Sequence, residues 1–485
     1  MRVQMKKILF VASEAVPFIK TGGLADVTGS LAHYIDRQNY DVRVILPKYA
    51  CMEDNLKKKL RFHSHFYVSL GWRNQYVGIL ETEEAGVHYY FVDNEYYFAG
   101  SQPYNQLHED IEKFAYFSKA VLAATEMIGF VPDIIHCHDW QAALVPVFLK
   151  AFASDYPQLQ RTKTICTIHN LRFQGRYSID VVKNLTGLPD EYFTPDKLES
   201  YGEANFLKGG IAYADAVTTV SPTYALEIMT KEGGESLDGL LYARRDSLYG
   251  IINGLDTQAY DPGHDIYLTH NFGVSDMKAG KRENKLALQR ELGLPEDADT
   301  MMLAMVSRLT DQKGLDLIAY IMDELLGHAR LQIVVLGTGQ EQYVDMLRYF
   351  AGKYPDKLSA NICYSEQLAH RIYASADALM MPSLFEPCGL SQLMGYCYGT
   401  LPIVRETGGL KDTVQPYNEY DHTGTGFSFA NYNAHEMLKI IYYAMHVYYD
   451  ERAHWDEMAQ RDMRLDYSWK KSAHAYEQLY ERLLS

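Results

Sequence analysis

Short apolar runs of strand length alternate with helical patterns along nearly the whole chain. Near the N-terminus, the run KILFVAS (7–13) precedes a helical pattern over about residues 24–36, and the run DVRVILP (41–47) follows it. Apolar strands separated by helices are typical of parallel, doubly wound sheets. The pattern therefore predicts an α/β fold.

Residues 61–93 break this rhythm. Their apolar positions alternate as in antiparallel strands, with turns expected at Gly71 and Gly86. We interpret this stretch as an excursion within an N-terminal domain. After a helical pattern over about residues 109–127, three more buried strands are predicted: DIIHCHDW (133–140), KTICTIHN (163–170) and AVTTVS (216–221).

A domain boundary is expected after GIINGLD (250–256), where the pattern relaxes into a polar segment. The alternation then restarts with the strands MLAMVS, LQIVVLG, NICYS, ALMMPS and LPIVRE, and ends in helical patterns over about 433–460 and 468–484. We expect an N-terminal domain (1–252) and a C-terminal domain (253–467), with the last helix (about 468–485) returning to the first. A ligand site is expected in a cleft between them, at the carboxyl ends of the strands.

Composition narrows the class of protein. The 485 residues are 47% apolar and 22% charged, as in globular proteins, and the net charge of −16 argues against nucleic acid or an anionic membrane as partner. Six cysteines without paired spacing predict free thiols and no structural metal. No apolar run is long enough to span a membrane. We expect a cytoplasmic enzyme or binding protein whose oligomeric state the sequence does not indicate.

The stretch KTGGLADV (20–27) contains a paired-glycine turn, Gly22 and Gly23, next to Lys20. A turn of this kind before a helix brings backbone amides and a helix N-terminus to an anionic group. It is also a common structural connector. The related stretch TGGLKD occurs at 407–412, again after a predicted strand and before a helix, which indicates that the same type of turn is used twice.

Two stretches of the second half strengthen the hypothesis of a phosphate site. VSRLTDQKG carries Arg308 in a loop and Lys313, which we expect one turn into the following helix; a solvated loop is the alternative. In LFEPCGLSQ, Gly389 and Leu390 would present amides at a helix N-terminus. Glu386 beside them suits a ligand with hydroxyl groups and developing positive charge, such as a sugar, unless it caps a helix.

Histidines mark two strands of the first half. His136 and His138 share a strand face and Asp139 follows, so a metal site is conceivable, but no third ligand is evident and we expect none. His169 lies at the end of the next strand, where a core or loop role is the simpler alternative to a role in a site.

Taken together, KTGGLADV, HDW, TIHN, GIINGLD, SRL-x2-QKG, FEPCGLSQ and TGGLKDTV resemble the bacterial glycogen synthase family, which is close to plant starch synthases. The resemblance extends from Lys7 to the last helix. It implies the GT-B fold, with two Rossmann-like domains facing across a deep cleft. It also implies transfer of glucose from ADP-glucose to the non-reducing end of an α-1,4-glucan, glycogen or a malto-oligosaccharide, with retention and without a metal or cofactor.

The resemblance also assigns residues. Lys20, His169, Arg308, Lys313 and Glu386 would act in catalysis, with Glu386 as the essential carboxylate. The implied donor-binding residues are Gly22, Gly23, Asn170, Tyr364 (on the adenine), Gly389, Leu390, Thr407 and Gly408. Asp26, Asp139 and Asn253 are candidates for the acceptor or the transition state.

One position departs from the wider group of retaining GT-B enzymes. Many of them carry a second glutamate eight residues after the first, and this chain has Met394 there, as the resembling branch does. We therefore favour same-face substitution. Two alternatives remain at this stage: another retaining glucosyltransferase that uses UDP-glucose, and a non-catalytic glucan-binding protein with the same fold.

Overall fold

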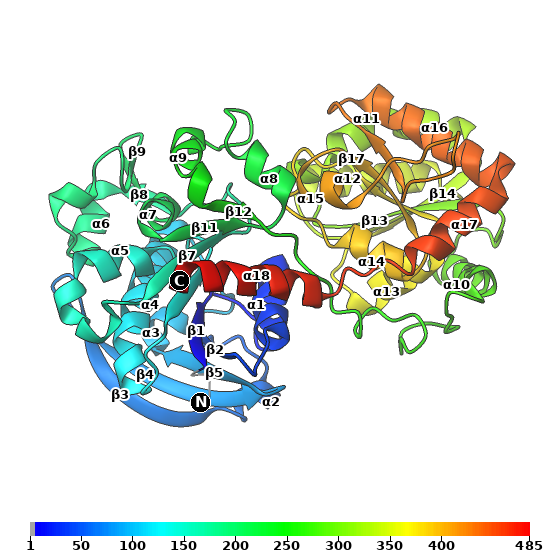
Figure 1. Cartoon of the computed structure of the whole chain (residues 1–485). Helices are drawn as coiled ribbons and strands as arrows, with labels where there is room; N and C mark the ends of the chain where they lie inside the picture. Colours follow the sequence, from blue (N-terminus) through cyan, green and yellow to red (C-terminus); the bar gives the residue numbers. More distant parts are fainter. Residues whose placement is uncertain (1–4) are drawn as a thin grey trace. The chain divides into compact units, whose positions relative to one another are not determined.

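The computed structural model describes residues 5–485 and divides the chain into two compact units. Residues up to Gly254 together with Trp469–Ser485 form the first unit, and Leu255–Ser468 form the second (Figure 1). Each unit contains its own sheet and its own buried apolar core.

The first unit is built on a nine-stranded sheet in the order β12-β11-β7-β6-β1-β2-β5-β4-β3. From β12 to β5 all neighbours are parallel, which confirms the predicted α/β pattern. These parallel strands are β1 (Lys6–Val11), β2 (Tyr40–Pro47), β5 (Val87–Asp93), β6 (Ile134–His138), β7 (Lys163–Ile168), β11 (Ala216–Thr219) and β12 (Leu248–Gly250).

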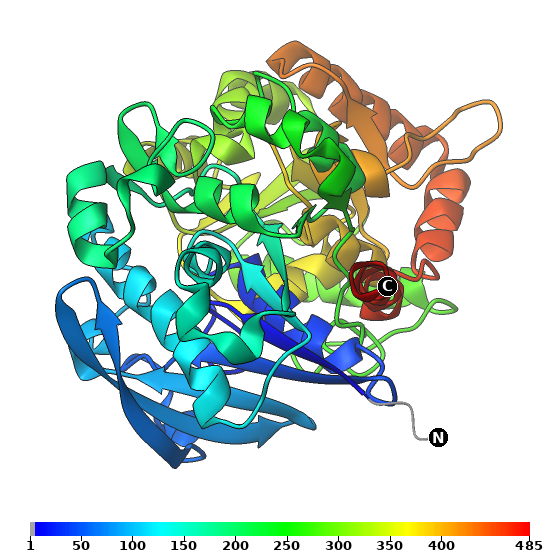
Figure 2. The same cartoon turned by 60° about the vertical axis from the view of Figure 1, so that its left-hand side comes forward.

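The predicted antiparallel excursion extends this sheet. Strands β3 (Arg61–Leu70) and β4 (Arg73–Glu84) form a hairpin, and β4 also pairs antiparallel with β5. Gly71 and Gly86 form the turns, both with positive φ, as predicted. Figure 2 shows the two long strands (blue) curving along one edge of the unit. A small separate sheet contains β8 (Arg176–Ser178), β9 (Glu199–Ser200) and β10 (Glu203–Asn205).

Helices cover the first sheet, and the last of them comes from the far end of the chain. Trp469, Tyr476 and Tyr480 of α18 (Trp469–Leu484) are buried in the core of the first unit. In Figure 1 this helix (red) lies beside α1 (blue). The other helices of the unit are α1 (Gly23–Tyr34), α2 (Asp54–Lys57), α3 (Glu95–Phe98), α4 (Leu107–Met127), α5 (Leu144–Ala151), α6 (Ile179–Thr186), α7 (Phe206–Tyr213), α8 (Pro222–Glu227) and α9 (Asp238–Ala243).

The second unit has a six-stranded parallel sheet in the order β15-β14-β13-β16-β17-β18. The order reverses between β13 and β16, the arrangement of a classical nucleotide-binding sheet. Its strands are β13 (Met301–Val306), β14 (Leu331–Leu336), β15 (Leu358–Asn361), β16 (Ala378–Met381), β17 (Leu401–Arg405) and β18 (Phe427–Phe429).

Two boundary predictions for the second unit are wrong. The run NICYS is not a strand: β15 ends at Asn361, and Ser365 already caps α13 (Glu366–Ser375) by accepting a hydrogen bond from the Leu368 amide. The helical pattern over 433–460 is two helices, α16 (Ala434–Asp450) and α17 (Arg452–Asp462), separated at Glu451. The remaining helices are α10 (Met277–Leu292), α11 (Leu315–His328), α12 (Glu341–Lys353), α14 (Ser391–Cys397) and α15 (Gly408–Thr413).

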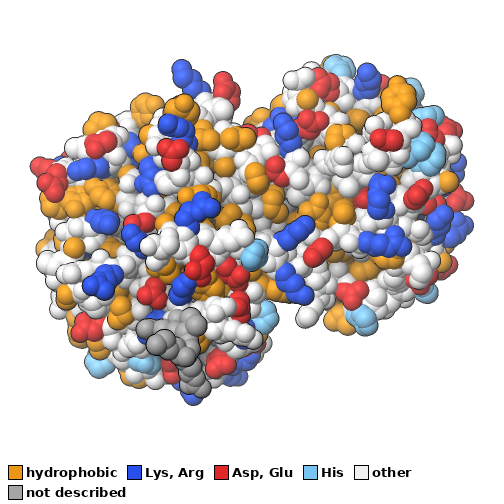
Figure 3. Space-filling view, viewed as in Figure 1, with side chains coloured by type: hydrophobic (Ala, Val, Ile, Leu, Met, Phe, Trp, Pro, Cys, Tyr) orange, Lys and Arg blue, Asp and Glu red, His pale blue; other side chains and the backbone are white. Residues whose placement is uncertain are grey.

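Charged side chains of both signs are interspersed over the visible face (Figure 3), so on this face the negative net charge is not gathered in one acidic patch. Within residues 5–485, no helix is long and apolar enough to cross a membrane.

Candidate active site

The candidate residues of the second unit follow the carboxyl ends of its parallel strands. Arg308 and Lys313 come after β13, Glu386 comes after β16, and Thr407 comes after β17. Strands β13 and β16 are neighbours at the point where the strand order reverses. Open α/β sheets bind ligands at such a point because the loops on either side diverge there.

Glu386 and Lys313 form an ion pair, with 2.6 Å between Lys313 Nζ and Glu386 Oε2. Both side chains are largely buried, at 16% and 9% exposure. The Ser383 hydroxyl donates to the same carboxylate oxygen at 2.9 Å. Among the described residues no donor contacts Glu386 Oε1, so this oxygen is available to accept a hydrogen bond from a ligand. The alternative of a helix-capping role for Glu386 does not fit these contacts.

Backbone contacts hold the Glu386 loop against the other site loops. The Leu384 amide donates to the Gln312 carbonyl at 2.9 Å, and the Gly409 amide donates to the Glu386 carbonyl at 3.1 Å. The Arg405 guanidinium donates to the carbonyls of Ser383 and Leu384. The segments after β13, β16 and β17 therefore form one connected rim.

One helix start differs from the prediction. Lys313 ends a short 3-10 turn (Asp311–Lys313), and α11 begins only at Leu315, because Gly314 adopts a left-handed conformation with φ of 72°. Gly389 also has φ of 72° and precedes Leu390, the N-cap residue of α14.

Arg308 and Tyr364 are exposed at this rim. Arg308 lies just beyond β13, and none of the described residues pairs with its guanidinium group. Tyr364 is 80% exposed in the loop after β15. Neither side chain packs in the core, and exposed loop residues of this kind often contact ligands.

In the first unit, the KTGG turn is held by a glutamate that the sequence analysis missed. The buried carboxylate of Glu14 accepts hydrogen bonds from the Thr21 amide, from the Thr21 hydroxyl at 2.8 Å and from the Tyr104 hydroxyl. Burial raises the pKa of Glu14. Gly22 is the N-cap residue of α1, and Gly23 opens the helix. Lys20 lies at the turn surface, 2.7 Å from an Asp26 carboxylate oxygen.

Asp139 and His169 meet at the ends of β6 and β7. Asp139 Oδ1 accepts a hydrogen bond from the His169 amide at 2.7 Å, and Asp139 adopts a positive φ of 56°. Burial raises the pKa of Asp139 to about 7, while backbone hydrogen bonds from His169 and Asn170 oppose that rise. The strained backbone at Asp139 is the kind that persists at functional sites.

His136, His138 and His169 form a chain of neighbouring rings at the ends of β6 and β7. His138 Nδ1 lies 3.0 Å from His169 Nε2, while His136 contacts Tyr480 and Thr167. Burial lowers the pKa of His136 and of His169 to about 3. Within residues 5–485, no group of three close metal-ligating side chains includes these histidines.

Asn253 lies just beyond β12 and is buried, and its Oδ1 accepts no hydrogen bond from the described residues. An unsatisfied buried acceptor is costly, so such atoms often await a ligand or water. Neither Glu14 nor Ser383 was predicted as part of a site. Glu14 has no distinguishing signal in the sequence, since Asp139 after β6 and Glu406 after β17 are also acidic residues that follow apolar strands.

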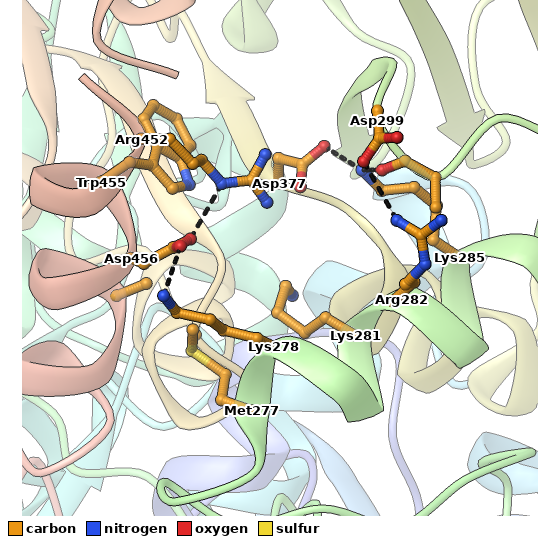
Figure 4. Close-up of a pocket in the computed structure, with 13 residues that line it drawn as sticks. Met277, Lys278, Lys281, Arg282, Lys285, Asp299, Asp377, Arg452, Trp455 and Asp456 are labelled. Atoms are coloured by element: carbon orange, nitrogen blue, oxygen red, sulfur yellow. Dashed lines mark hydrogen bonds and ion pairs between the residues drawn. The ribbon is translucent and has the colours of Figure 1, made fainter. Parts of the chain in front are cut away.

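A separate cavity of about 170 Å³ in the second unit is lined by Lys278, Lys281, Lys285, Arg282 and Arg452 (Figure 4). Four of these cations form ion pairs. Asp456 pairs with both Lys278 and Arg452, Asp299 pairs with Arg282, and Asp377 pairs with Lys285. Lys281 instead donates to backbone carbonyls and to Thr400, and burial lowers its pKa to about 7. These pairings make the cavity a structural network joining α10 to α17, and not a second anion site.

Comparison with known proteins gives full-length similarities. Residues 7–243 match a family model described as the starch synthase catalytic domain, and residues 289–462 match one described as glycosyl transferases group 1. The chain is 58% identical to a glycogen synthase of Lachnospira eligens, covering 99% of this chain and 100% of the relative. It is 47% identical to a glycogen synthase of Bacillus anthracis, covering 98% and 99%.

Among solved structures, the chain is similar to the catalytic domain of starch synthase IV from Arabidopsis thaliana, bound to ADP and acarbose. The TM-score is 0.91 at 32% identity, with coverage of 99% of this chain and 100% of that one. A sucrose-phosphate synthase from Thermosynechococcus elongatus, at 17% identity and a TM-score of 0.61, shares the fold.

Proposed function

The chain belongs to the glycogen synthase family, and we propose that its second unit binds the diphosphate of ADP-glucose through Arg308 and Lys313. The family's reaction is glucosyl transfer that elongates glycogen, on a two-domain GT-B fold. The observation that carries the proposal is the Lys313–Glu386 pair at the strand-order reversal of the second sheet. ADP as the nucleotide is supported by the starch synthase IV structure, which contains ADP.

The cations of this rim suit a nucleoside diphosphate. Arg308 supplies a guanidinium group that can bind two phosphate oxygens at once, and Lys313 supplies an ammonium group. The amides of Gly389 and Leu390 add hydrogen-bond donors at the start of α14. Thr407, whose amide donates to the Arg405 carbonyl at 2.9 Å, and Gly408 are proposed to line the donor site at the start of α15. With these groups, charge on the leaving ADP is stabilised without a metal ion. Tyr364 is proposed to stack on the adenine.

Glu386 is proposed to bind the glucose ring. Its Oε2 is occupied by Lys313 and Ser383, so Oε1 accepts a hydrogen bond from a sugar hydroxyl. As the bond from glucose C1 to the phosphate oxygen breaks, positive charge develops on the ring, and a buried carboxylate stabilises it. ADP leaves with the electron pair.

The acceptor supplies the new bond. A hydroxyl at the non-reducing end of the glucan attacks C1 and loses its proton to the leaving diphosphate on the same face, so the configuration is retained. Position 394 is a methionine, so the position expected for a second glutamate offers no nucleophile. We propose that Lys20, Gly22, Gly23, His169 and Asn170 of the first unit contact the donor, and that Asp26, Asp139 and Asn253 act on the acceptor or the transition state.

The test is a glucosyl transfer assay with glycogen as acceptor and either ADP-glucose or UDP-glucose as donor. We expect incorporation of glucose from ADP-glucose with kcat/KM at least about tenfold higher than from UDP-glucose. A preference for UDP-glucose and a small acceptor would instead support another retaining glucosyltransferase. Glucan binding without turnover of either donor would support the non-catalytic alternative.

A Glu386→Gln variant tests the proposed carboxylate. The substitution keeps the size and removes the charge, so we expect kcat to fall by about 10²–10³ while the protein remains folded. Glu341→Gln, on the exposed start of α12, is the matched control and should keep its activity. A Glu386→Gln enzyme with near-normal turnover would contradict the role assigned to Glu386.

A further inference from the structure

Three metal-ligating side chains meet in the second unit, away from the segments assigned to the donor. His422 lies in the loop between α15 and β18, Glu451 separates α16 from α17, and His454 lies in the first turn of α17. Each offers one ligand atom, and these three atoms lie within 4.8 Å of one another. Within residues 5–485, this is the one group of three such side chains with that geometry.

The two imidazole rings are stacked. Their centroids are 3.6 Å apart with an angle of 24° between the planes. His454 Nδ1 lies 3.5 Å from Glu451 Oε2. His422 from the loop and His454 from α17 are therefore in direct contact, with Glu451 beside them.

Tyr417 orients the ring of His422. The Tyr417 hydroxyl donates to Glu451 Oε2 at 3.1 Å and lies 2.8 Å from His422 Nδ1. Because the hydroxyl donates to Glu451, its oxygen faces His422 Nδ1 as an acceptor, which orients the imidazole ring. Such an outer partner is what orients metal-binding histidines.

Backbone hydrogen bonds hold the loop that carries His422. His422 has a φ of 56°, unusual for a residue other than glycine, and its amide donates to the Asn418 carbonyl at 2.8 Å. Arg461 of α17 donates to the carbonyls of His422 and Gly424. The Glu451 carbonyl accepts the His454 amide at 2.9 Å, which fixes the spacing of these two residues. The backbone segments that carry the three residues are thus fixed, while the two rings still have to turn toward a common ion.

We propose that His422, Glu451 and His454 form a zinc site that fastens the 415–426 loop to α17. Two imidazoles and one carboxylate are a ligand set that suits Zn²⁺, and water or the nearby His446 completes a tetrahedron. His446 Nε2 lies 3.7 Å from the second carboxylate oxygen of Glu451. Since a shared ion needs both rings edge-on, binding opens the stacked pair. The site is structural and takes no part in the transfer reaction.

The experiment uses the full-length protein, treated with a chelator and titrated with Co²⁺ and then with Zn²⁺. We expect one equivalent of Co²⁺ to give the intense d–d absorption of a tetrahedral site without a thiolate charge-transfer band, and Zn²⁺ to displace it. A thiolate band would assign the metal to cysteines such as the exposed Cys363 and overturn the proposal. The absence of a saturable cobalt signal would overturn it as well.

Variants locate the site. His422→Asn is the informative change, because asparagine tolerates the positive φ and supplies no imidazole. It and His454→Asn should each weaken Zn²⁺ binding by about 100-fold and abolish the rise in Tm that Zn²⁺ gives to the parent protein. His435→Asn, on the exposed start of α16, is the matched control. Unchanged affinity in both site variants would contradict the proposal.

Folding of the variants is checked independently of the metal. In the presence of chelator, His422→Asn and His454→Asn should match the parent protein in circular dichroism and in glucosyl transfer. If only one of the two variants folds, its Zn²⁺ affinity alone tests the proposal, since each variant removes one of the three ligands. Loss of glucosyl transfer on chelation of the parent protein would show that the ion is not purely structural.

Discussion

Lys20 carries a positive charge at a surface turn. It lies beside Asp26 rather than in the core, and exposed ion pairs of this kind contribute only about 0–1 kcal/mol to stability. Lys20→Ala should therefore leave the Tm nearly unchanged. If Lys20 contacts the donor, the KM for ADP-glucose should rise about tenfold, the value of one charge-assisted hydrogen bond. Lys58→Ala, on an exposed turn, is the control. Unchanged donor kinetics would make the turn purely structural.

The buried histidines predict a pH dependence of the first unit. Burial lowers the pKa of His138 and takes those of His136 and His169 to about 3, below the ordinary value of about 6.5. Acid then protonates the unfolded chain first, so the stability they give is present above about pH 6.5 and is lost as the pH falls toward about 3. Asp139, with a pKa raised to about 7, and Glu14, whose pKa burial also raises, oppose this, but two carboxyls are set against three rings.

Hydrogen exchange measures this effect locally. After correction for intrinsic rates, β6 and β7 should lose protection between about pH 7 and about pH 5. Strands β13 and β14, which contain no histidine, are the internal control. Equal changes in both sheets would contradict the assignment to the buried rings.

For single residues, the sequence predicts which site residues lie at the ends of strands. It does not predict which residues they contact. Lys313 and Glu386 were both expected at the site, but their ion pair joins positions 73 apart, which no local spacing reveals. Glu14 was missed because its role depends on Tyr104, 90 residues away in the chain. The positive φ of Asp139 also has no sequence signature, since it results from the packing of β6 against β7.

Among the elements, the turn before α15 controls the position of Glu386. Gly408 has a φ of 45°, and a Cβ atom added there would lie 1.9 Å from the Glu386 carbonyl oxygen. Gly408→Ala should therefore destabilise the second unit by about 1–3 kcal/mol and lower glucosyl transfer, because the Glu386 backbone must move.

Gly352→Ala is the matched substitution. Gly352 lies within α12 with no atom within 4 Å of the added Cβ, so alanine there should stabilise the protein by about 0.4–1 kcal/mol and leave transfer unchanged. Chemical unfolding and steady-state kinetics on the two variants give the comparison. Normal activity of Gly408→Ala would show that the Glu386 loop tolerates the displacement.

The predicted elements are confirmed where the apolar runs are long. The predictions are wrong where a helix-capping residue sets the boundary of an element. Most strands of the parallel sheets were located from their apolar runs, since a strand covered on both faces needs a continuous apolar segment. The short strands β12 and β18 were not predicted. The strand predicted at NICYS was placed too late because the Ser365 cap already directs the chain into α13. The break at Glu451 was missed because both flanking segments are good helix formers.

At the scale of the whole molecule, the two units depend differently on the end of the chain. Helix α18 buries Trp469, Tyr476 and Tyr480 in the first unit, and Tyr480 contacts His136 at 3.0 Å. A chain ending at Ser468 should therefore lose the fold of the first unit, since each large aromatic side chain contributes roughly 3–5 kcal/mol in a core.

The second unit should survive this truncation, because Leu255–Ser468 contain its whole sheet and core. Limited proteolysis of the truncated chain should leave a resistant fragment that contains Leu255–Ser468, while the full-length protein is resistant in both units. A truncated chain with equally protected halves would contradict the dependence on α18.

The return of α18 also sets an order for biosynthesis. A ribosome releases β1 to β12 first, yet their core stays incomplete until the last helix leaves the exit tunnel. The second unit has all its strands by then and can finish folding earlier. The half of the enzyme that is translated first is thus completed last, and until then the core residues that α18 covers are exposed to chaperones.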